Sequence, residues 1–213
     1  MTTIPQSAIA PDSALVTDPT DFGGSATGVQ LEELFVEFTR RHSQSPWQFE
    51  LSPEGKVIIM APTYYPGSVH ENAASGALFV WAMDLGGVAT GPTAAYRLPR
   101  SGGVVGPDAA WTSADRWESH THVAGEPIAV CPDFVIEIRS GSDNLAPLHD
   151  KMRLYMQNGA ALGWLIDPPN RRVYVYRAGL AEPELRENPA LLTEEDLLPG
   201  FVFEVGRWIF DRV

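Results

Sequence analysis

The chain has a single cysteine, few basic residues and no long hydrophobic run. These shortages argue against a disulfide framework, a DNA-attracting surface and a membrane-spanning helix. Cys131 is the only cysteine among 213 residues, so no intramolecular disulfide can form. A lone cysteine beside a strand is usually a small buried apolar residue rather than a nucleophile. No segment has the length of a membrane-spanning helix, and the N-terminus has neither a basic start nor an apolar run of signal length. These features predict a cytoplasmic protein with no membrane partner.

Positive charge is also scarce. The formal net charge is -12 and the pI is about 4.7, the opposite of the field that attracts DNA phosphates. The acidic residues are unevenly placed: residues 182–204 hold seven carboxylates and one arginine, whereas residues 134–177 hold six Lys or Arg and four Asp or Glu. The second of these segments is therefore the least acidic part of the chain. The sequence shows no Gly-rich nucleotide loop, cysteine cluster or Ser-His-Asp arrangement.

The hydrophobic pattern predicts one α/β (α+β) domain with a mixed β-sheet flanked by helices. Residues 1–27 are rich in Pro, Ser, Thr, Gly and Asp and are expected to form a loose arm, with a single domain at 28–213. The domain should begin with a helix at 29–42 and a β-hairpin at 49–60. The later elements are expected to be a helix at 68–85, strands at 94–98, 104–112 and 134–139, a helix at 145–158, a hairpin of 163–166 with 172–176, and a strand at 201–205.

The segment 131–151, CPDFVIEIRSGSDNLAPLHDK, carries the most chemistry. Asp133, Glu137 and Arg139 alternate along one apolar strand, so they share a face and need partners or a metal ion if that face is buried. If the preceding strand is its neighbour, Asp108 and Glu137 can share one Mg²⁺ or Mn²⁺. Asp133 lies roughly 13 Å from Glu137 along the strand, too far to share that ion. The alternative is that Asp108 and Asp133 are only turn or strand-entry acids after proline.

Two basic residues are candidates for catalysis or substrate binding beside Asp108 and Glu137. Lys151 lies on the following helix, where its ammonium can orient a water molecule and stabilise charge on the phosphorane. Arg139 can bind a substrate phosphate, although its pKa excludes it as a general base. The alternatives are a solvated helix lysine for Lys151 and, for Arg139, a structural ion pair with Asp133 or Asp108.

His70 and Glu71 begin the helix expected at 68–85. Adjacent helical positions point about 100° apart, so only one of the two side chains can face a given cleft. We assign His70 a substrate-binding role and leave open whether Glu71 faces the site instead. The alternative is that both interact only with the helix dipole or with solvent.

Four segments in order carry a family resemblance: RLPRSGGVVGPDAAWTSADRW, CPDFVIEIRSGSD, KMRLYMQNGAALGWLIDPPNRRVYVYR and LLPGFVFEV. Together they resemble the bacterial Uma-type family of "putative restriction endonucleases". The resemblance covers most of the chain and implies the PD-(D/E)XK nuclease superfamily, with a restriction-endonuclease-like sheet and a Mg²⁺ site that holds Asp108 and Glu137. The superfamily lysine normally lies two residues after the second acid, where this chain has Arg139, so the resemblance points to Lys151 instead.

Functions of different classes follow from these observations. The first is a Mg²⁺-dependent endonuclease that hydrolyses DNA with Asp108, Glu137 and Lys151 and, by analogy with enzymes that cut both strands, acts as a homodimer. The second is a catalytically inactive nuclease-fold binding or assembly module, which the acidic composition favours. A third is a phosphodiesterase that acts on a small nucleotide. A basic cleft around Arg139, Lys151 and Arg153 favours the nuclease, and we expect Lys151→Ala to abolish cleavage with a near-wild-type melt.

Overall fold

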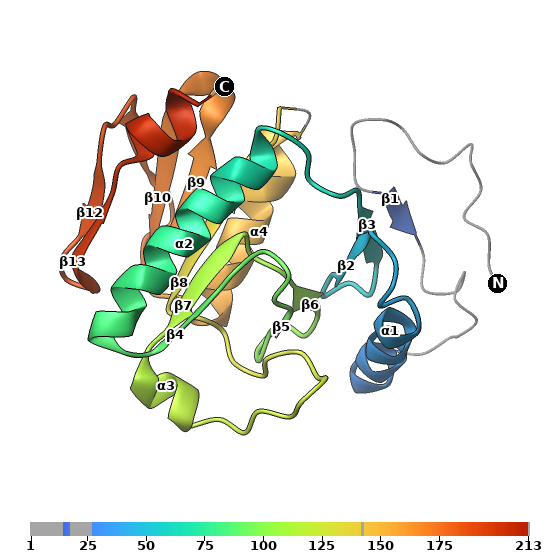
Figure 1. Ribbon diagram of the computed structural model, residues 1–213. Helices are drawn as coiled ribbons and strands as arrows, with labels where there is room; N and C mark the ends of the chain where they lie inside the picture. The colour runs from blue at the N-terminus through green and yellow to red at the C-terminus, as the bar shows by residue number, and fades with distance from the viewer. Residues whose placement is uncertain (1–14, 18–26, 142, 213) are drawn as a thin grey trace.

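The computed structural model describes residues 15–17, 27–141 and 143–212. Its centre is a six-stranded mixed sheet (Figure 1). The strands lie side by side in the order β11 (Glu184–Glu187), β10 (Arg172–Arg177), β9 (Leu162–Asp167), β8 (Phe134–Ile138), β7 (Ala109–Thr112) and β4 (Val88–Thr90). Strands β8 and β9 run parallel, and the other neighbours run antiparallel.

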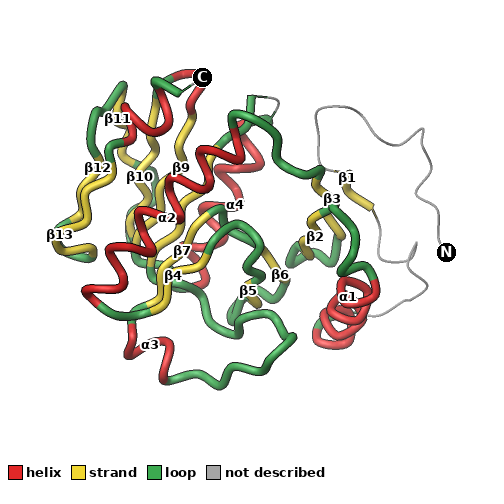
Figure 2. Tube along the Cα trace, viewed as in Figure 1, coloured by secondary structure: helices red, strands yellow, loops and turns green. Residues whose placement is uncertain are grey.

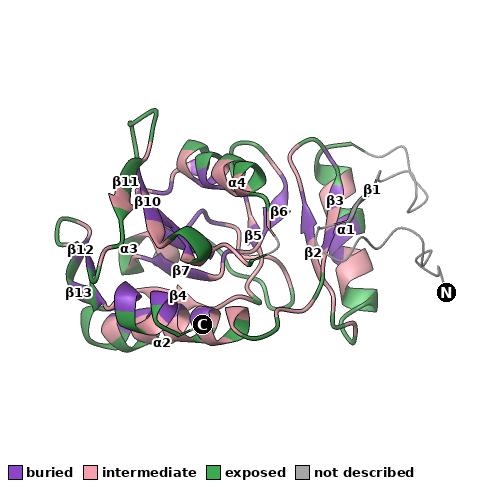
Figure 3. Cartoon of the chain, turned by 90° about the horizontal axis from the view of Figure 1, so that it is seen from above, coloured by how far each residue is buried: buried purple, intermediate pink, exposed green. Residues whose placement is uncertain are grey.

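Two long helices cover opposite faces of the central sheet, as Figure 3 shows from above. Helix α2 (Gly67–Leu85) packs Leu78 on the face that carries Ile136. Helix α4 (Leu145–Asn158) covers the other face, where Val135 is buried. Because β8 and β9 are parallel, the chain needs a crossover between them, and α4 provides it. The C-terminal end of β8 thus leads directly toward α4.

A second, smaller sheet is built mainly from the N-terminal part of the chain. Its strands lie in the order β1 (Leu15–Thr17), β3 (Val57–Met60), β2 (Gln48–Leu51), β6 (Val104–Val105) and β5 (Tyr96–Arg97). Helix α1 (Val29–Arg41) lies beside this sheet (Figure 2) and buries Phe35 against Leu51 and Val104. The small sheet therefore has its own apolar cluster, and its strands β5 and β6 also contribute Tyr96 and Val105 to the cluster beneath α4.

Residues 106–108 join the two sheets. Strand β6 belongs to the small sheet and β7 to the central one, and Gly106, Pro107 and Asp108 are all that separates them. Proline has no N–H to donate to a strand partner, which ends the ladder here. The backbone N–H of Gly106 instead donates to Glu50 at 2.8 Å. This junction is where the candidate site lies.

The C-terminal part completes the core on the α2 side. Strands β12 (Leu192–Glu194) and β13 (Leu198–Phe203) form a two-stranded ladder, followed by the helical turn η4 (Gly206–Phe210). Phe201 stacks on Trp164 of the central sheet, with ring centroids 5.9 Å apart. The remaining short elements are α3 (Ala114–Glu118) and η3 (Pro168–Asn170). Within the described ranges, no helix combines the length and the apolar character needed to cross a bilayer.

The predicted fold class, the helices at 29–42, 68–85 and 145–158, and both hairpins are confirmed. The continuous strand at 104–112 is wrong, because Pro107 divides it between two sheets. The strand expected at 201–205 is β13, which ends at Phe203, and the short strands β4, β11 and β12 were not predicted. Within the expected loose arm, Leu15–Thr17 pairs with β3; the rest of the arm except Thr27 and the final residue, Val213, lie outside the described residues.

Candidate active site

Asp108 and Glu137 come from neighbouring strands at the junction of the two sheets. The antiparallel register pairs Ala109 with Ile136, so Asp108, one residue before β7, continues opposite Glu137. The backbone N–H of Ile138 donates to Asp108 Oδ2 at 2.6 Å and holds that carboxylate against β8. Glu137 points toward α4, because the hydroxyl of Tyr155 donates to its Oε1 at 3.0 Å. The structure therefore brings the two expected acids together on the side of the sheet that α4 covers.

Lys151 reaches into the same junction from α4. Its Nζ lies 3.0 Å from Glu137 Oε1 and 2.8 Å from Glu50 Oε1, and it donates to the carbonyl oxygen of Gly106 at 2.8 Å. The side chain is only 16% exposed. The ammonium thus points at the acids rather than into solvent, which removes the solvated-lysine alternative.

Two residues of the cluster were missed in the sequence. Glu50 lies on β2 and is buried, and its Oε1 accepts hydrogen bonds from both Gly106 and Lys151. Tyr155 lies on α4, where it is fully buried and donates to Glu137. The signal for Glu50 was available: a carboxylate inside an apolar hairpin strand poses the same burial problem as Glu137. Nothing local, however, indicates that this hairpin meets α4.

Asp108 and Glu137 are hard to ionise. Burial, and next the charge of Glu137, raise the pKa of Asp108 well above its ordinary value. Burial raises the pKa of Glu137 to about 7, although the Lys151 ammonium opposes this change. Burial alone would lower the pKa of Lys151, but the Glu137 and Glu50 carboxylates outweigh it and hold that pKa above its ordinary value. Lys151 is therefore a cation at neutral pH, surrounded by more acids than it can neutralise.

His70 and Glu71 lie in the first turns of α2, and Glu71 is the one that interacts electrostatically with Asp108. Its charge contributes to the raised pKa of Asp108, and burial raises its own pKa. His70 is buried, with its Nε2 3.0 Å from the carbonyl oxygen of Arg212. The ring contacts the C-terminal segment rather than the carboxylates, so the substrate-binding role expected for His70 is not carried forward.

Arg139 is engaged in a structural ion pair. Its Nη1 lies 3.0 Å from Oδ1 of the fully buried Asp167, and its Nε donates to the carbonyl oxygen of Asp143. The partner differs from the two considered in the sequence, because Asp133 pairs with Arg116 at 3.1 Å and Asp108 is held by β8. The geometry gives Arg139 a structural role in place of the expected phosphate contact.

The basic cleft that favours a nuclease is not formed by the residues considered for it. Arg139 pairs with Asp167, Lys151 with Glu50 and Glu137, and Arg153 with Asp150. Each positive charge is thus matched by at least one carboxylate. Attraction of a phosphate backbone to this region therefore depends on a further cation.

The acids fit a hard divalent ion. In the described part of the chain, no three or more His, Cys, Asp or Glu side chains are grouped as a preformed metal site. Mg²⁺ does not need such a group, because it is usually held by one or two carboxylates while water and substrate oxygens complete its shell. Asp108 and Glu137 could supply that donor set, and a bound cation would relieve the excess of acids over the one ammonium group.

Comparison with known proteins agrees with the fold. The Uma2 family model, described as "Putative restriction endonuclease", matches residues 33–206. The structure is similar to the crystal structure of "a putative nuclease belonging to DUF820" from Anabaena variabilis, with a TM-score of 0.60 and 21% identity over 76% of this chain and 89% of that one. At this identity the likeness concerns the fold alone. Comparison with curated proteins gave no match.

Proposed function

The chain belongs to the Uma2 family, and from this premise we propose that it is a Mg²⁺-dependent endonuclease that hydrolyses DNA phosphodiester bonds. The observation that carries the proposal is the cluster of Glu50, Asp108 and Glu137 around Lys151. Buried charges cost folding free energy unless they are fully compensated. Acids with strongly raised pKa values beside a specific charge partner are found preferentially at functional sites.

In this mechanism Asp108 and Glu137 would hold the metal ion. When bound, a Mg²⁺ or Mn²⁺ ion would supply a charge that polarises a phosphate oxygen and lowers the pKa of bound water. The Tyr155 hydroxyl and the Lys151 ammonium orient Glu137. Because Lys151 stays protonated, we assign it no role as a base: its positive charge stabilises developing negative charge on the phosphate. Its three N–H donors already contact Glu50, Glu137 and Gly106, so it can donate to the attacking water only by releasing one of these acceptors. Glu50 is a positioning residue, since it contacts Lys151 rather than the substrate in this scheme.

The test is cleavage of plasmid DNA by purified protein with Mg²⁺, Mn²⁺ or EDTA. We expect cleavage with either ion and none in EDTA. Asp108→Asn and Glu137→Gln should each lose at least about 100-fold, because loss of a ligand should cost no less than the roughly 10–100-fold that loss of a residue supporting a ligand costs. Asp84→Asn, which neutralises an exposed carboxylate on α2, is the matched control and should cleave like wild type. Cleavage by Asp108→Asn at the wild-type rate would remove the site assignment.

A catalytically inactive binding or assembly module is the second candidate. The charge pairing around Arg139, Lys151 and Arg153 favours it, because a surface without excess positive charge binds duplex DNA weakly. Wild-type protein that binds Mn²⁺ but cleaves neither plasmid nor single-stranded DNA would establish this alternative.

We also propose a homodimer in the cytoplasm. A chain with one site cuts one strand at a time, so cutting both strands is simplest with two copies. Helix α2 offers a surface, because Phe79, Val80 and Met83 are 55%, 64% and 71% exposed, and contiguous exposed apolar side chains mark interaction sites. Sedimentation of wild type and Met83→Glu tests this: a dimer that becomes a monomer supports the proposal, and a wild-type monomer at all concentrations refutes it.

A further inference from the structure

A pocket adjoins the proposed active site and shares residues with it. The pocket has a volume of about 340 Å³ and lies between α1, the segment 45–50, and the residues around 92–95 and 104–106. Two of its lining residues, Glu50 and Gly106, each bind Lys151 Nζ at 2.8 Å. The wall of the pocket and the ammonium of the candidate site are therefore in direct contact.

The lining of the pocket suits a flat ring with polar edges. Phe35, Trp47 and Phe49 supply aromatic surface, and Thr39 and Gln48 supply hydrogen-bonding groups. Pockets for small organic groups usually combine a mostly apolar wall with a few such polar groups. Aromatic side chains stack on nucleobases of any sequence, because every base has a π-face.

We propose that this pocket binds an unpaired nucleobase of the substrate, next to the phosphate that is cleaved. The inference rests on the proposed function and specifies its substrate class: DNA that is single-stranded, or whose nucleotide is turned out of the duplex, at the site of cleavage. A base held against Glu50 and Gly106 places its own sugar and phosphate near the candidate site, because these two residues contact the Lys151 ammonium.

The size of the pocket agrees with a single nucleotide. At about 340 Å³ it is near the lower end of the roughly 300–1,000 Å³ typical of small-ligand sites. A base pair within a stacked duplex cannot enter it, so a duplex substrate must first expose a base. Enzymes that place a base in a pocket spend unstacking free energy, which is least where the base is already unpaired.

The charge distribution also favours binding through a nucleobase rather than through phosphate contacts. The chain carries a net charge of -12, and Arg139, Lys151 and Arg153 are paired with carboxylates. Binding that depends mainly on phosphate contacts is weak on such a surface. Base stacking in an aromatic pocket supplies binding free energy that does not need a positive surface.

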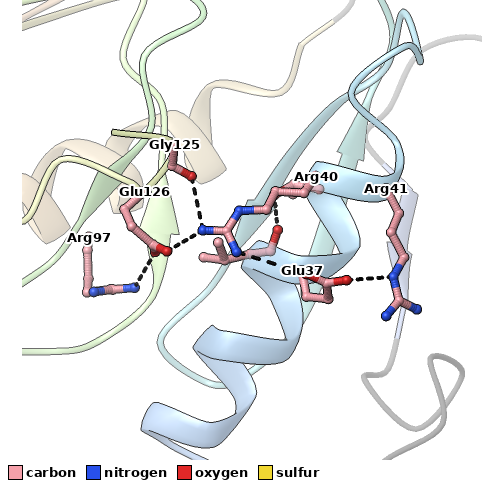
Figure 4. Close-up of polar contacts among 8 residues, drawn as sticks. Glu37, Arg40, Arg41, Arg97, Gly125 and Glu126 are labelled. Atoms are coloured by element: carbon pink, nitrogen blue, oxygen red, sulfur yellow. Dashed lines mark hydrogen bonds and ion pairs between the residues drawn. The ribbon is translucent and has the colours of Figure 1, made fainter. Parts of the chain in front are cut away.

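Polar contacts link Arg40 of α1 to Glu126 and Gly125, and Glu126 to Arg97 (Figure 4). Thr39 and Pro127 line the pocket, and the residues next to them, Arg40 and Glu126, form an ion pair. Arg97 also pairs with Glu126, at 3.7 Å. These contacts connect α1 to the loop that carries Pro127, so the two walls of the pocket are in polar contact near Thr39 and Pro127.

The experiment measures binding of fluorescent oligonucleotides in EDTA, where the proposed chemistry is off. Three probes are compared: single-stranded DNA, the same strand with a central run of abasic sites, and the fully paired duplex. Free dTMP is added as a competitor. Thr93→Trp places a bulky side chain at the exposed pocket rim, and Thr193→Trp, exposed on β12, is the matched control. Both variants are checked by thermal melts.

We expect the single strand to bind about 10-fold or more tightly than the abasic strand or the duplex, in line with the stacking of one base. Thr93→Trp should lose that preference and Thr193→Trp should keep it. Competition by dTMP as effective as by the oligonucleotide would assign the pocket to free nucleotides and overturn the DNA substrate. Equal binding of normal and abasic strands, or a Thr93→Trp protein that binds like wild type, would overturn the pocket itself.

The two proposals fail separately. Pocket-dependent binding without cleavage in Mg²⁺ or Mn²⁺ rejects the proposed chemistry and keeps the pocket. Metal-dependent cleavage that ignores abasic sites and Thr93→Trp keeps the chemistry and rejects the pocket.

Discussion

Replacing Lys151 by methionine removes one positive charge while nearly preserving the length of the side chain. In the structure this ammonium contacts Glu50, Glu137 and the carbonyl oxygen of Gly106. All three acceptors lose a donor in Lys151→Met, and the two carboxylates remain in a buried environment. The variant therefore tests the account through stability as well as through activity.

The expected cost is large for a single substitution. Breaking a buried ion pair by removing one partner typically costs about 3–5 kcal/mol. For a domain of this size, that free energy lowers Tm by on the order of 10 °C. The sequence predicted a melt near wild type after loss of the Lys151 side chain. The structure instead predicts a lower Tm, because this lysine is enclosed by Glu50 and Glu137 rather than solvated.

The effect must depend on pH in a definite direction. Lys151 opposes the raised pKa of Glu137, so its removal raises that pKa further above the unfolded value. An acid whose folded pKa is raised loses stability as pH rises from its unfolded pKa through its folded pKa. The destabilisation of Lys151→Met should thus be large at pH 8 and smaller at pH 5.5, where Glu137 holds a proton in the folded state.

Thermal melts of wild type and Lys151→Met at pH 8 and pH 5.5 measure this destabilisation. The chain has two lysines, Lys56 and Lys151, and Lys56 is exposed, so Lys56→Met is the matched control and should melt like wild type. A Lys151→Met protein within 2–3 °C of wild type at pH 8, against the shift of about 10 °C estimated above, would refute the reasoning, as would equal destabilisation at pH 8 and pH 5.5.

Three further predictions concern the same cluster. Asp108→Asn should raise the Tm of the metal-free protein by a few degrees at pH 8, because burial makes the ionised form of Asp108 costly. The increase in Tm should become smaller as the pH falls toward the ordinary pKa range of a carboxyl group. A variant with a lower Tm than wild type at pH 8 contradicts this prediction. Mg²⁺ should raise Tm more at pH 8 than at pH 5.5, since binding competes with protonation of Glu137, whose pKa is about 7; equal shifts count against a site there. Arg139→Ala should lower stability by about 3 kcal/mol in urea melts, because the buried Asp167 loses its cation; an unchanged melt with weaker substrate binding would restore the phosphate role.

Local patterns explain what was predictable. Helix 145–158 follows from apolar residues at helical spacing and ends at Gly159, whose φ of 110° suits the left-handed helix terminus. The pairing of Asp108 with Glu137 followed from the alternation of strand side chains and from their sequence order. Both arguments use only residues that are close in the chain or lie on consecutive predicted strands.

Long-range contacts explain what was missed. Glu50 and Lys151 are far apart in sequence, and only the packing of the small sheet against α4 makes them neighbours. The same holds for Arg139, whose partner Asp167 lies across the parallel pair at the end of β9. The division of the strand at Pro107 was a readable signal, because proline cannot continue a central ladder.

The central claim is that Asp108 and Glu137 together hold a divalent ion. Anomalous diffraction from crystals soaked in Mn²⁺ tests it most directly. The account predicts one anomalous peak between the carboxylates of Asp108 and Glu137, which would be the residues that hold the ion. Saturating Mn²⁺ that leaves no peak between these carboxylates, or that binds only at other acids of the chain, would contradict it.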